Sequence, residues 1–321
     1  MRAGDLERMR TALDRGTRFV LELQGAAGQW SDFEVDGAVE SDAWVTGYVG
    51  AALCAARTVS NRPLDRALAA ARQFLERALD GRAGWGYAGA APVDADSTAW
   101  ALALLARCGG APRAGYDGLR SHRREDGGFS TYRQFSDPSM WRHSQADVSA
   151  AALGALLNES PLDRATIDAC AAYLLAQQRD DGSWPSFWYA TPLYATLHAL
   201  RALTCNDRAP LEPERVAGAV RYAAHERAAD DPFALALAAS ILLRYGDADL
   251  ARPLVDELLA LQRPDGRWTA GAPLMRPDPW NFAAGDPDAA IFDQRGLFTT
   301  ATAIESLALA VERAGGGSAN G

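Results

Sequence analysis

The sequence predicts an all-α fold, an (α/α)6 barrel or toroid built from six helical-hairpin repeats. Two observations predict it. Charged, amphipathic stretches alternate six times with smooth stretches rich in alanine and leucine, and glycine with an aromatic residue recurs in the turns between them. Internal repetition of this kind indicates a repeat architecture, in which each unit buries its apolar face against its neighbours. We therefore expect six outer helices to enclose six inner helices in a closed ring.

The two members of each repeat differ in their pattern. The first mixes charged and apolar residues at helical spacing, as expected for an outer helix with one wet and one buried face. These stretches are Leu6–Leu23, Pro63–Leu79, Tyr116–His122, Arg164–Gln178, Pro213–Arg227 and Leu250–Gln262. The second is apolar almost all round, as expected for an inner helix that is shielded on every side. These stretches are Trp44–Ala56, Thr98–Arg107, Val148–Leu157, Leu193–Leu203, Phe233–Tyr245 and Thr299–Glu312.

Four of the turns have closely similar sequences. They are LQGAAGQW (Leu23–Trp30), HRREDGGF (His122–Phe129), QQRDDGSW (Gln177–Trp184) and LQRPDGRW (Leu261–Trp268). The fifth unit lacks such a turn, so its inner stretch alone supports the repeat there.

Composition narrows the function classes. With 48% hydrophobic residues and no Pro/Ser linker, residues 1–313 are expected to form one domain, followed by a disordered tail at 314–321. A net charge of −9 argues against a nucleic-acid partner. All 32 basic residues are arginine, which excludes a P-loop lysine, a Schiff-base lysine and a pyridoxal phosphate anchor.

The cysteines and the apolar runs bear on localisation. Cys54, Cys108, Cys170 and Cys205 are widely spaced, which predicts reduced thiols and a cytoplasmic protein. We expect neither a signal peptide nor a transmembrane segment, because no apolar run has the required pattern. The sequence leaves open the oligomeric state and a peripheral contact with a membrane.

The N-termini of the inner helices are the expected place for a site. Asp42, Asp96 with Ser97, Asp147 and Asp231 precede or open inner stretches, which is helix N-cap chemistry. Because the inner helices of such a barrel run parallel, their N-termini should meet at one mouth. Two long connections, 130–146 and 269–298, lead into inner stretches and are expected to lie over it. For 269–298, which holds Trp280 and Phe282, a lid and plain surface elaboration are both open.

A pair of carboxylates opens the second inner stretch. Either Asp96 or Ser97 would cap this helix, which leaves Asp94 surplus. Two carboxyl groups in a poorly hydrated mouth raise at least one pKa, whereas the helix N-terminus strengthens the acid. A protonated but strong carboxylic acid suits protonation of an alkene. The structural alternative is a capped helix with a spare surface aspartate.

An aromatic cluster precedes the fourth inner stretch. Phe187, Trp188, Tyr189 and Tyr194 have no counterpart in the other repeats, whereas Trp184 belongs to a repeated turn and is expected in the core. At the mouth, the π faces of such residues could stabilise a carbocation without reacting with it.

These segments resemble a known family. The turns are similar to the QW repeats of squalene–hopene and oxidosqualene cyclases. The segments DADSTA (94–99), GGF (127–129), DVSA (147–150) and GSW with LYAT (182–196) resemble in order the DxDDTA, GGW, DVTA and GSW…LYGT segments of squalene–hopene cyclase. The chain is thus similar to class II terpene cyclases, as a single-domain member with length for one barrel where most of them have two.

The resemblance implies a role for individual residues. Asp96 matches the aspartic acid that protonates the terminal alkene or epoxide, and Asp94 matches its partner. Ser97 stands where the motif has its last aspartate, and Ala151 stands where squalene–hopene cyclase has a histidine, for which His143 is a candidate substitute. Asp147 is a further supporting residue. The aromatic residues expected to line the cavity are Trp44, Trp100, Trp188, Tyr189 and Tyr194.

The function expected from this resemblance is protonation-initiated cyclisation of a linear isoprenoid, either a prenyl diphosphate, an epoxide or a prenylated aromatic precursor. No cofactor and no bound metal are expected, and Mg²⁺ would be needed only for a diphosphate substrate. Two alternatives are an inactive isoprenoid- or peptide-binding barrel and an enzyme of the same fold acting on a non-terpene substrate. Protein prenyltransferase β subunits share the barrel but need zinc, and Asp168 with Cys170 lies in an outer stretch.

Overall fold

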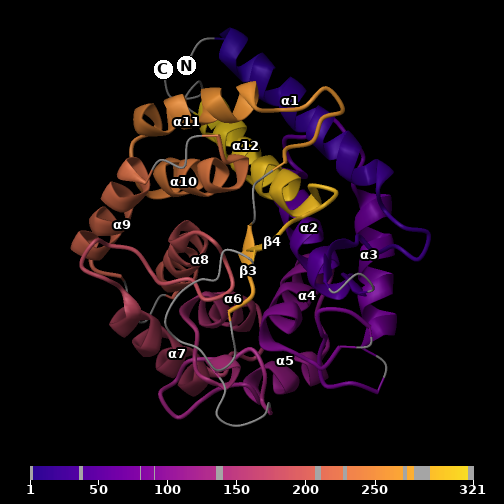
Figure 1. The fold of residues 1–321 in the computed structure, drawn as a ribbon, viewed down its shortest axis with the longest axis vertical. Coiled ribbons are helices and arrows are strands. Elements are labelled where there is room, and N and C mark those ends of the chain that lie inside the picture. Colours follow the sequence, from indigo (N-terminus) through magenta and orange to yellow (C-terminus); the bar gives the residue numbers. More distant parts are fainter. Residues whose placement is uncertain are drawn as a thin grey trace.

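The computed structural model describes residues 3–35, 39–79, 81–89, 91–134, 140–206, 211–226, 230–269, 273–277 and 290–316. Within them, helices form two concentric rings (Figure 1). The outer helices are α1 (Ala3–Glu22), α3 (Asp65–Ala78), α5 (Arg113–Arg120), α7 (Arg164–Gln177), α9 (Pro213–His225) and α11 (Ala248–Ala260). The inner helices are α2 (Ala43–Ala56), α4 (Ala95–Arg107), α6 (Ala146–Leu156), α8 (Pro192–Thr204), α10 (Pro232–Tyr245) and α12 (Leu297–Gly316). The predicted (α/α)6 barrel is confirmed.

The inner helices pack against one another in sequence and close the ring. Each contacts the next one along the chain, and α12 returns to contact α2. Glycine allows the approach of α2 to α4. A Cβ atom on Gly47 would lie 2.6 Å from the backbone carbon of Trp100, and one on Gly50 would lie 2.4 Å from Leu104. A larger side chain at either position would force these two helices apart.

The turns fasten outer helices to inner helices through one repeated pair of hydrogen bonds. A tryptophan Nε1 donates to the backbone carbonyl ten residues earlier in the outer helix. Its backbone N–H donates to a threonine hydroxyl of the next inner helix. The pairs are Trp30 with Thr46, Trp85 with Thr98, Trp184 with Thr196 and Trp268 with Thr300. At Phe129 only the backbone bond remains, to Ser149.

The turn that ends at Trp85 is not among the four turns with similar sequences. Trp85 makes the same two contacts as its counterparts, but its segment GRAGW has neither the glutamine nor the aspartate, each of which occurs in three of the four similar turns. The structural repeat therefore depends on the buried indole and the threonine, and less on the polar residues of the turn.

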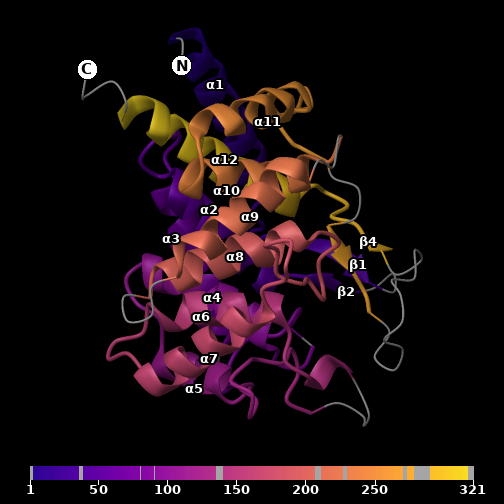
Figure 2. The same ribbon diagram turned by 90° about the vertical axis from the view of Figure 1, so that its left-hand side faces the viewer.

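Two short antiparallel ribbons lie at the end of the barrel where the inner helices begin. One pairs β1 (Asp32–Val35) with β2 (Val39–Ser41), and the other pairs β3 (Leu274–Met275) with β4 (Ala290–Ile291). Figure 2 shows β1, β2 and β4 together on one side of the helical rings. The sequence does not predict these strands, because a segment of two to four residues is too short to show the alternation of apolar and polar residues that marks a strand.

The second ribbon belongs to the connection 269–298. Its first strand joins the aromatic segment before α8, since Met275 N–H donates to the carbonyl of Trp188 over 2.8 Å and Ala190 N–H donates to that of Pro273 over 3.0 Å. The described part of this connection therefore lies over the mouth, as expected. Trp280 and Phe282 lie outside the described residues, and the lid stays a prediction.

Helix α12 continues to Gly316, three residues past the expected boundary, and the rest of the predicted tail lies outside the described residues. No helix in the described part of the chain is both long enough and apolar enough to span a membrane.

Candidate active site

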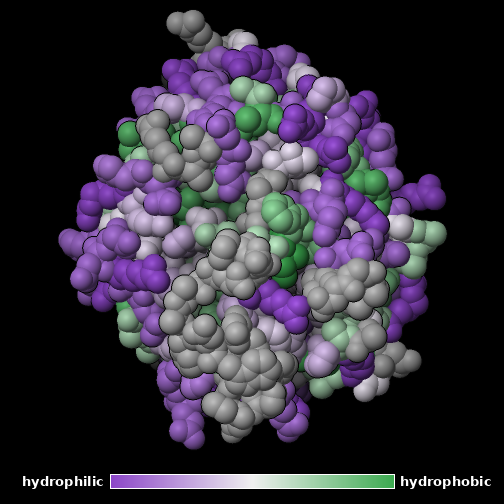
Figure 3. All heavy atoms as spheres, in the orientation of Figure 1, coloured by the Kyte–Doolittle hydropathy of each residue, from purple (hydrophilic) through white to green (hydrophobic). Residues whose placement is uncertain are grey.

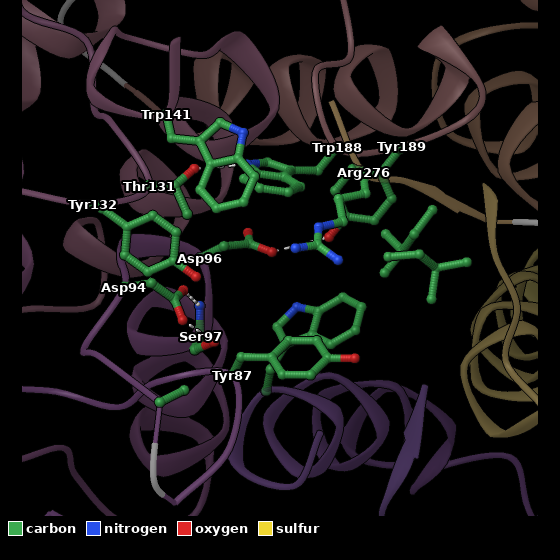
Figure 4. Close-up of a pocket in the computed structure, with 14 residues that line it drawn as sticks. Tyr87, Asp94, Asp96, Ser97, Thr131, Tyr132, Trp141, Trp188, Tyr189 and Arg276 are labelled. Carbon is green, nitrogen blue, oxygen red and sulfur yellow. Dashed lines mark hydrogen bonds between the residues drawn. The ribbon is translucent and has the colours of Figure 1, made fainter. Parts of the chain in front are cut away.

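A cavity of about 320 Å³ opens at the mouth, where α2 and α4 begin. Figure 3 shows hydrophobic residues near the centre of this face, within a rim of hydrophilic ones. The lining residues, drawn in Figure 4, are Trp44, Tyr87, Ala91, Asp94, Asp96, Ser97, Thr131, Tyr132, Trp141, Trp188, Tyr189, Leu274, Arg276 and Ile291. The cavity thus combines a wall of aromatic rings with two carboxyl groups.

Asp96 lies in the first turn of α4 and its side chain points into this cavity (Figure 4). The residue is 8% exposed. Its Oδ2 accepts a hydrogen bond from the Tyr189 hydroxyl over 3.0 Å, and its Oδ1 has no hydrogen-bond partner among the described residues. Burial of a carboxyl group away from water favours its neutral form.

The electrostatic surroundings hold the proton on Asp96. Burial raises the pKa of Asp96 well above its usual value, and the neighbouring carboxyl groups of Asp94 and Asp147 raise it further. Tyr189 and the nearby indole of Trp44 act in the opposite direction and lower this pKa. These surroundings favour the protonated form of Asp96, and the two polar groups beside it favour release of the proton.

The N-cap of α4 corrects one expectation. Asp94 caps the helix, because its Oδ1 accepts from Ser97 N–H and its Oδ2 from the Ser97 hydroxyl, each over 2.7 Å. Neither Asp96 nor Ser97 is the cap, and Asp94 is not surplus. Burial raises the pKa of Asp94 to about 6, against the effect of the Ser97 hydrogen bonds. The carboxyl that the cap does not use is therefore Asp96, the one whose role the family resemblance had implied.

Asp147 is fully buried in the first turn of α6 and does not line the cavity. Its Oδ2 accepts from the backbone N–H groups of Phe187 and Trp188 over 2.7 and 2.8 Å, and its Oδ1 accepts from Val148 N–H. Burial raises the pKa of Asp147, while these backbone donors lower it. Asp147 thus fixes the backbone of the aromatic segment and supports the site from outside the cavity.

His143 is exposed and does not line the cavity. It directly follows the short 3-10 helix η1 (Met140–Arg142), within the connection 130–146. The structure therefore places His143 in a loop, outside the lining of the cavity that holds Asp96.

Three of the five predicted aromatic residues line the cavity: Trp44, Trp188 and Tyr189. Trp100 and Tyr194 do not, which corrects that part of the prediction. They lie one layer deeper, where Trp100 Nε1 donates to the Tyr194 hydroxyl over 2.9 Å. The ring of Tyr194 stacks on that of Tyr189 with centroids 3.3 Å apart, so this layer supports Tyr189 from behind.

The structure adds lining residues that sequence reasoning missed. Tyr87 stacks on Trp44, and Trp141 packs on Trp188 with centroids 5.1 Å apart. Trp188 Nε1 also donates to Thr131 Oγ1 over 2.6 Å. Tyr132 and Arg276 complete the rim. In the sequence, the unusual length of the connections 130–146 and 269–298 indicated that they lie over the mouth. Length alone does not show which of their side chains point into the cavity.

No cluster of three or more histidine, cysteine, aspartate or glutamate side chains within the described residues is arranged to hold a metal ion. The chemistry that the cavity itself offers is that of a buried carboxyl group with a raised pKa, facing aromatic rings. Such a site can deliver a proton to a weak base and stabilise a cation that forms beside it.

Comparisons with known proteins agree with this geometry. No protein-family model matches the sequence. A curated relative, drimenyl diphosphate synthase of Streptomyces showdoensis, is 29% identical over 229 residues. That match covers 64% of this chain but 40% of the relative, so the chain corresponds to less than half of that enzyme's length.

Solved structures match over nearly the whole chain. A variant of the type II terpene cyclase MstE from Scytonema, in complex with its substrate geranylgeranyl dihydroxybenzoate, is 25% identical with a TM-score of 0.83. The match covers 96% of this chain and 99% of the other. A protein from Actinoplanes is 30% identical with a TM-score of 0.74, covering 94% and 99%. These comparisons relate the chain to type II terpene cyclases.

Proposed function

We propose that this chain is a class II terpene cyclase, in which Asp96 protonates the terminal double bond or epoxide of a linear isoprenoid and thereby starts its cyclisation. One observation carries the proposal. Asp96 is a buried carboxyl group, whose pKa is raised by burial and by neighbouring carboxyl groups, in a cavity lined by aromatic rings. The relatives named above support it, because the sequence and fold are those of enzymes that cyclise isoprenoids.

The first step transfers the proton of Asp96 to the substrate alkene. The π electrons of the alkene form the new C–H bond, which leaves a tertiary carbocation on the substrate and a carboxylate on Asp96. The Tyr189 hydroxyl then donates its hydrogen bond to a charged acceptor, which is stronger than a bond to a neutral one. This gain is greatest after proton transfer, so Tyr189 makes Asp96 a stronger acid.

The later steps form rings within the same cavity. Each remaining double bond of the substrate attacks the cation, and the positive charge moves along the chain until a proton is lost to a base. The faces of Trp44, Trp188 and Tyr189 stabilise the passing charge. Because one proton enters and one leaves, the reaction is an isomerisation, and Asp96 must regain a proton before the next turnover.

The cavity must exclude bulk water, since water would trap the cation as an alcohol. The ribbon β3–β4 supplies Leu274 and Ile291 to the lining and is hydrogen bonded to the aromatic segment. Trp141 Nε1 donates to the carbonyl of Pro277 over 2.9 Å, which joins the two long connections over the mouth. We assign the role of lid to the described part of the connection 269–298, residues 273–277 and 290–291.

The substrate class follows from the walls and the rim. The apolar and aromatic walls suit a prenyl chain, and Arg276 at the rim suits an anionic head group such as a diphosphate or a benzoate. The named activities of the relatives cover both kinds of head group. With a diphosphate substrate, Mg²⁺ would accompany the head group; otherwise no cofactor takes part.

Two finer assignments belong to the same proposal. The tryptophan turns correspond to the QW repeats of squalene–hopene cyclases, supported by the hydrogen bonds that four of them share. The protein works in the cytoplasm, which its four free cysteines support.

Product analysis tests the proposal against an inactive binding barrel. The purified protein and its Asp96→Asn variant are incubated with farnesyl diphosphate, geranylgeranyl diphosphate and geranylgeranyl dihydroxybenzoate. The proposal predicts a cyclised isomer of one of these from the wild type and none from the variant. Tight binding with no product from either protein would favour the binding barrel instead.

A further inference from the structure

A second cavity, of about 460 Å³, lies between the inner helices α4, α6 and α8, toward their C-terminal ends. The first cavity lies at the N-terminal ends, and no function has been assigned to the second. Part of its wall consists of alanine and glycine from α4 and α6. Arg107, Arg164, Arg201 and His198 add nitrogen donors to this smooth wall, and no carboxylate is among the lining residues.

Arg107 and Arg201 carry two positive charges, and Glu305 is the negative charge that the structure places against them within the described residues. Arg201 forms an ion pair with Glu305 at 2.7 Å. Arg107 donates to the carbonyl of Ala51 over 3.3 Å, and within the described residues it has no carboxylate at ion-pair distance. The same single carboxylate, Glu305, therefore faces both guanidinium groups.

The pKa directions agree with this charge imbalance. Burial lowers the pKa of Arg107, and the positive charge of Arg201 lowers it further. Burial alone would raise the pKa of Glu305, but Arg201, Arg107 and Arg244 outweigh it and bring this pKa to about 2. Glu305 is thus ionised over the whole neutral range and cannot neutralise the guanidinium groups that surround it.

His198 is a further nitrogen-bearing side chain beside this cavity. It lines the cavity, is 5% exposed, and its Nε2 is buried with no hydrogen-bond partner among the described residues. Burial lowers the pKa of His198 to about 3, so the ring is neutral while the cavity is empty. Buried polar atoms in native proteins are nearly always paired, so an unpaired one calls for an explanation.

At Gly154 the wall of the second cavity lacks a side chain although there is space for one. A Cβ atom added there would meet nothing within 4 Å, whereas one on Gly47 would collide with α4. Glycine is unfavourable inside a helix, and helix packing does not require it at 154. Gly154 lines the cavity, so its missing side chain adds directly to the space available for a ligand.

We propose that this second cavity binds an oxyanion of phosphate type, held by Arg107 and Arg201 with His198 as a further donor. Guanidinium groups bind phosphate oxygens in pairs and are the usual choice for this chemistry. The anion is either free diphosphate or the head group of a prenyl diphosphate, whose chain would lie along the alanine wall. The inference does not depend on the proposed cyclase activity, because the site shares no lining residue with the first cavity.

The structural alternative is that these arginines only offset the negative C-terminal ends of the inner helices. A matched control separates the two ideas. Arg313 lies in the last turn of α12 and donates to the carbonyl of Arg244, but it does not line the cavity. Arg313→Gln removes the same charge from a helix C-terminus and leaves the cavity intact.

The test is isothermal titration calorimetry with inorganic diphosphate and, in an Asp96→Asn background that does not consume it, with farnesyl diphosphate. We expect saturable binding of diphosphate to the wild type, weakened about tenfold or more in Arg107→Gln, since a hydrogen bond to a charged group is lost. Gly154→Leu, which fills the cavity without touching its charges, is expected to abolish binding. Arg313→Gln is expected to bind as the wild type does.

The two ligands distinguish the sources of the anion. For farnesyl diphosphate, loss of one of two binding sites in Gly154→Leu would identify a prenyl diphosphate as the ligand. An unchanged titration of farnesyl diphosphate, with diphosphate binding lost, would identify the free anion. The proposal is overturned if neither ligand binds the wild type at this cavity, or if Gly154→Leu, shown by thermal melting to be folded, binds both as the wild type does.

Discussion

The hydroxyl of Tyr189 donates a hydrogen bond to Oδ2 of Asp96 over 3.0 Å, and this bond joins the segment before α8 to the first turn of α4. The two residues are 93 positions apart in the sequence. Their contact places the acid of one inner helix against the aromatic cluster of another. In the proposed mechanism this single bond sets how readily Asp96 gives up its proton.

Tyr189→Phe tests that bond. The variant keeps the ring that stacks on Tyr194 but loses the donor, so the pKa of Asp96 rises and the acid becomes weaker. We expect kcat to fall by about 10- to 100-fold, as for loss of a hydrogen bond to a charged group, with little change in KM. Steady-state kinetics measures both constants. An equal loss of kcat in Tyr194→Phe, which leaves the Asp96 bond in place, would show that the effect is only one of packing.

Asp94 has two functions that a pair of variants can separate. Asp94→Asn keeps a good N-cap for α4 but removes the negative charge that raises the pKa of Asp96. Asp96 then loses its proton at lower pH, so the fall of kcat/KM on the alkaline side should move to lower pH. Asp94→Ala should shift the profile in the same direction and also destabilise the fold by about 1 kcal/mol through loss of the cap. A pH profile that both variants leave unmoved would contradict the charge coupling.

Asp96→Asn should stabilise the protein at neutral pH while abolishing turnover. Because the folded-state pKa of Asp96 is raised, its contribution to stability is fully present below the unfolded pKa near 3.8 and is lost as pH rises through the folded pKa. The neutral amide avoids that loss. We expect Tm at pH 7 to rise by a few degrees, with no gain near pH 4. Thermal melts at both values check this, and a large drop in Tm at pH 7 would show that Asp96 is chiefly structural.

Asp147→Asn tests the positioning of the aromatic segment. An amide oxygen can still accept from one or two of the three backbone donors, but the amide nitrogen must face another N–H group. We expect a loss of about 1–3 kcal/mol in unfolding free energy and a lower kcat as Trp188 shifts. Urea unfolding and kinetics measure these. Asp163→Asn is the control, because Asp163 caps the outer helix α7 far from the cavity lining and should leave kcat unchanged.

The fold was largely predictable because alternation of charged and apolar helices extends over the whole chain, so each of the twelve described helices has a predicted counterpart. The position of the site followed from the same pattern, since parallel inner helices bring Asp94 and Asp96 to one end. The assignment of the cap did not follow. Two aspartates two residues apart can each cap a helix, and only the contact of Asp94 with Ser97 decides between them.

The remaining errors concern depth and closure. Trp100 and Tyr194 are aromatic, as expected of a cavity wall, but they lie one layer behind Tyr189. The sequence does not show how deep along the barrel axis a side chain lies. Tyr87, Trp141 and Arg276 reach the cavity through connections whose path depends on contacts across the mouth. His143 illustrates the reverse case, because closeness to Asp147 in sequence did not bring it to the cavity.

The origin of the first proton is the central claim, and an incubation in deuterium oxide tests it most directly. Once the enzyme is equilibrated in this solvent, Asp96 carries deuterium, and cyclisation of an alkene substrate should place one deuterium on the former CH carbon of its terminal double bond in each product molecule. Mass spectrometry and deuterium NMR of the product locate it. The account predicts this label from the wild type and no product from Asp96→Asn. Cyclised product without deuterium, or product formed by the variant at the wild-type rate, would contradict it.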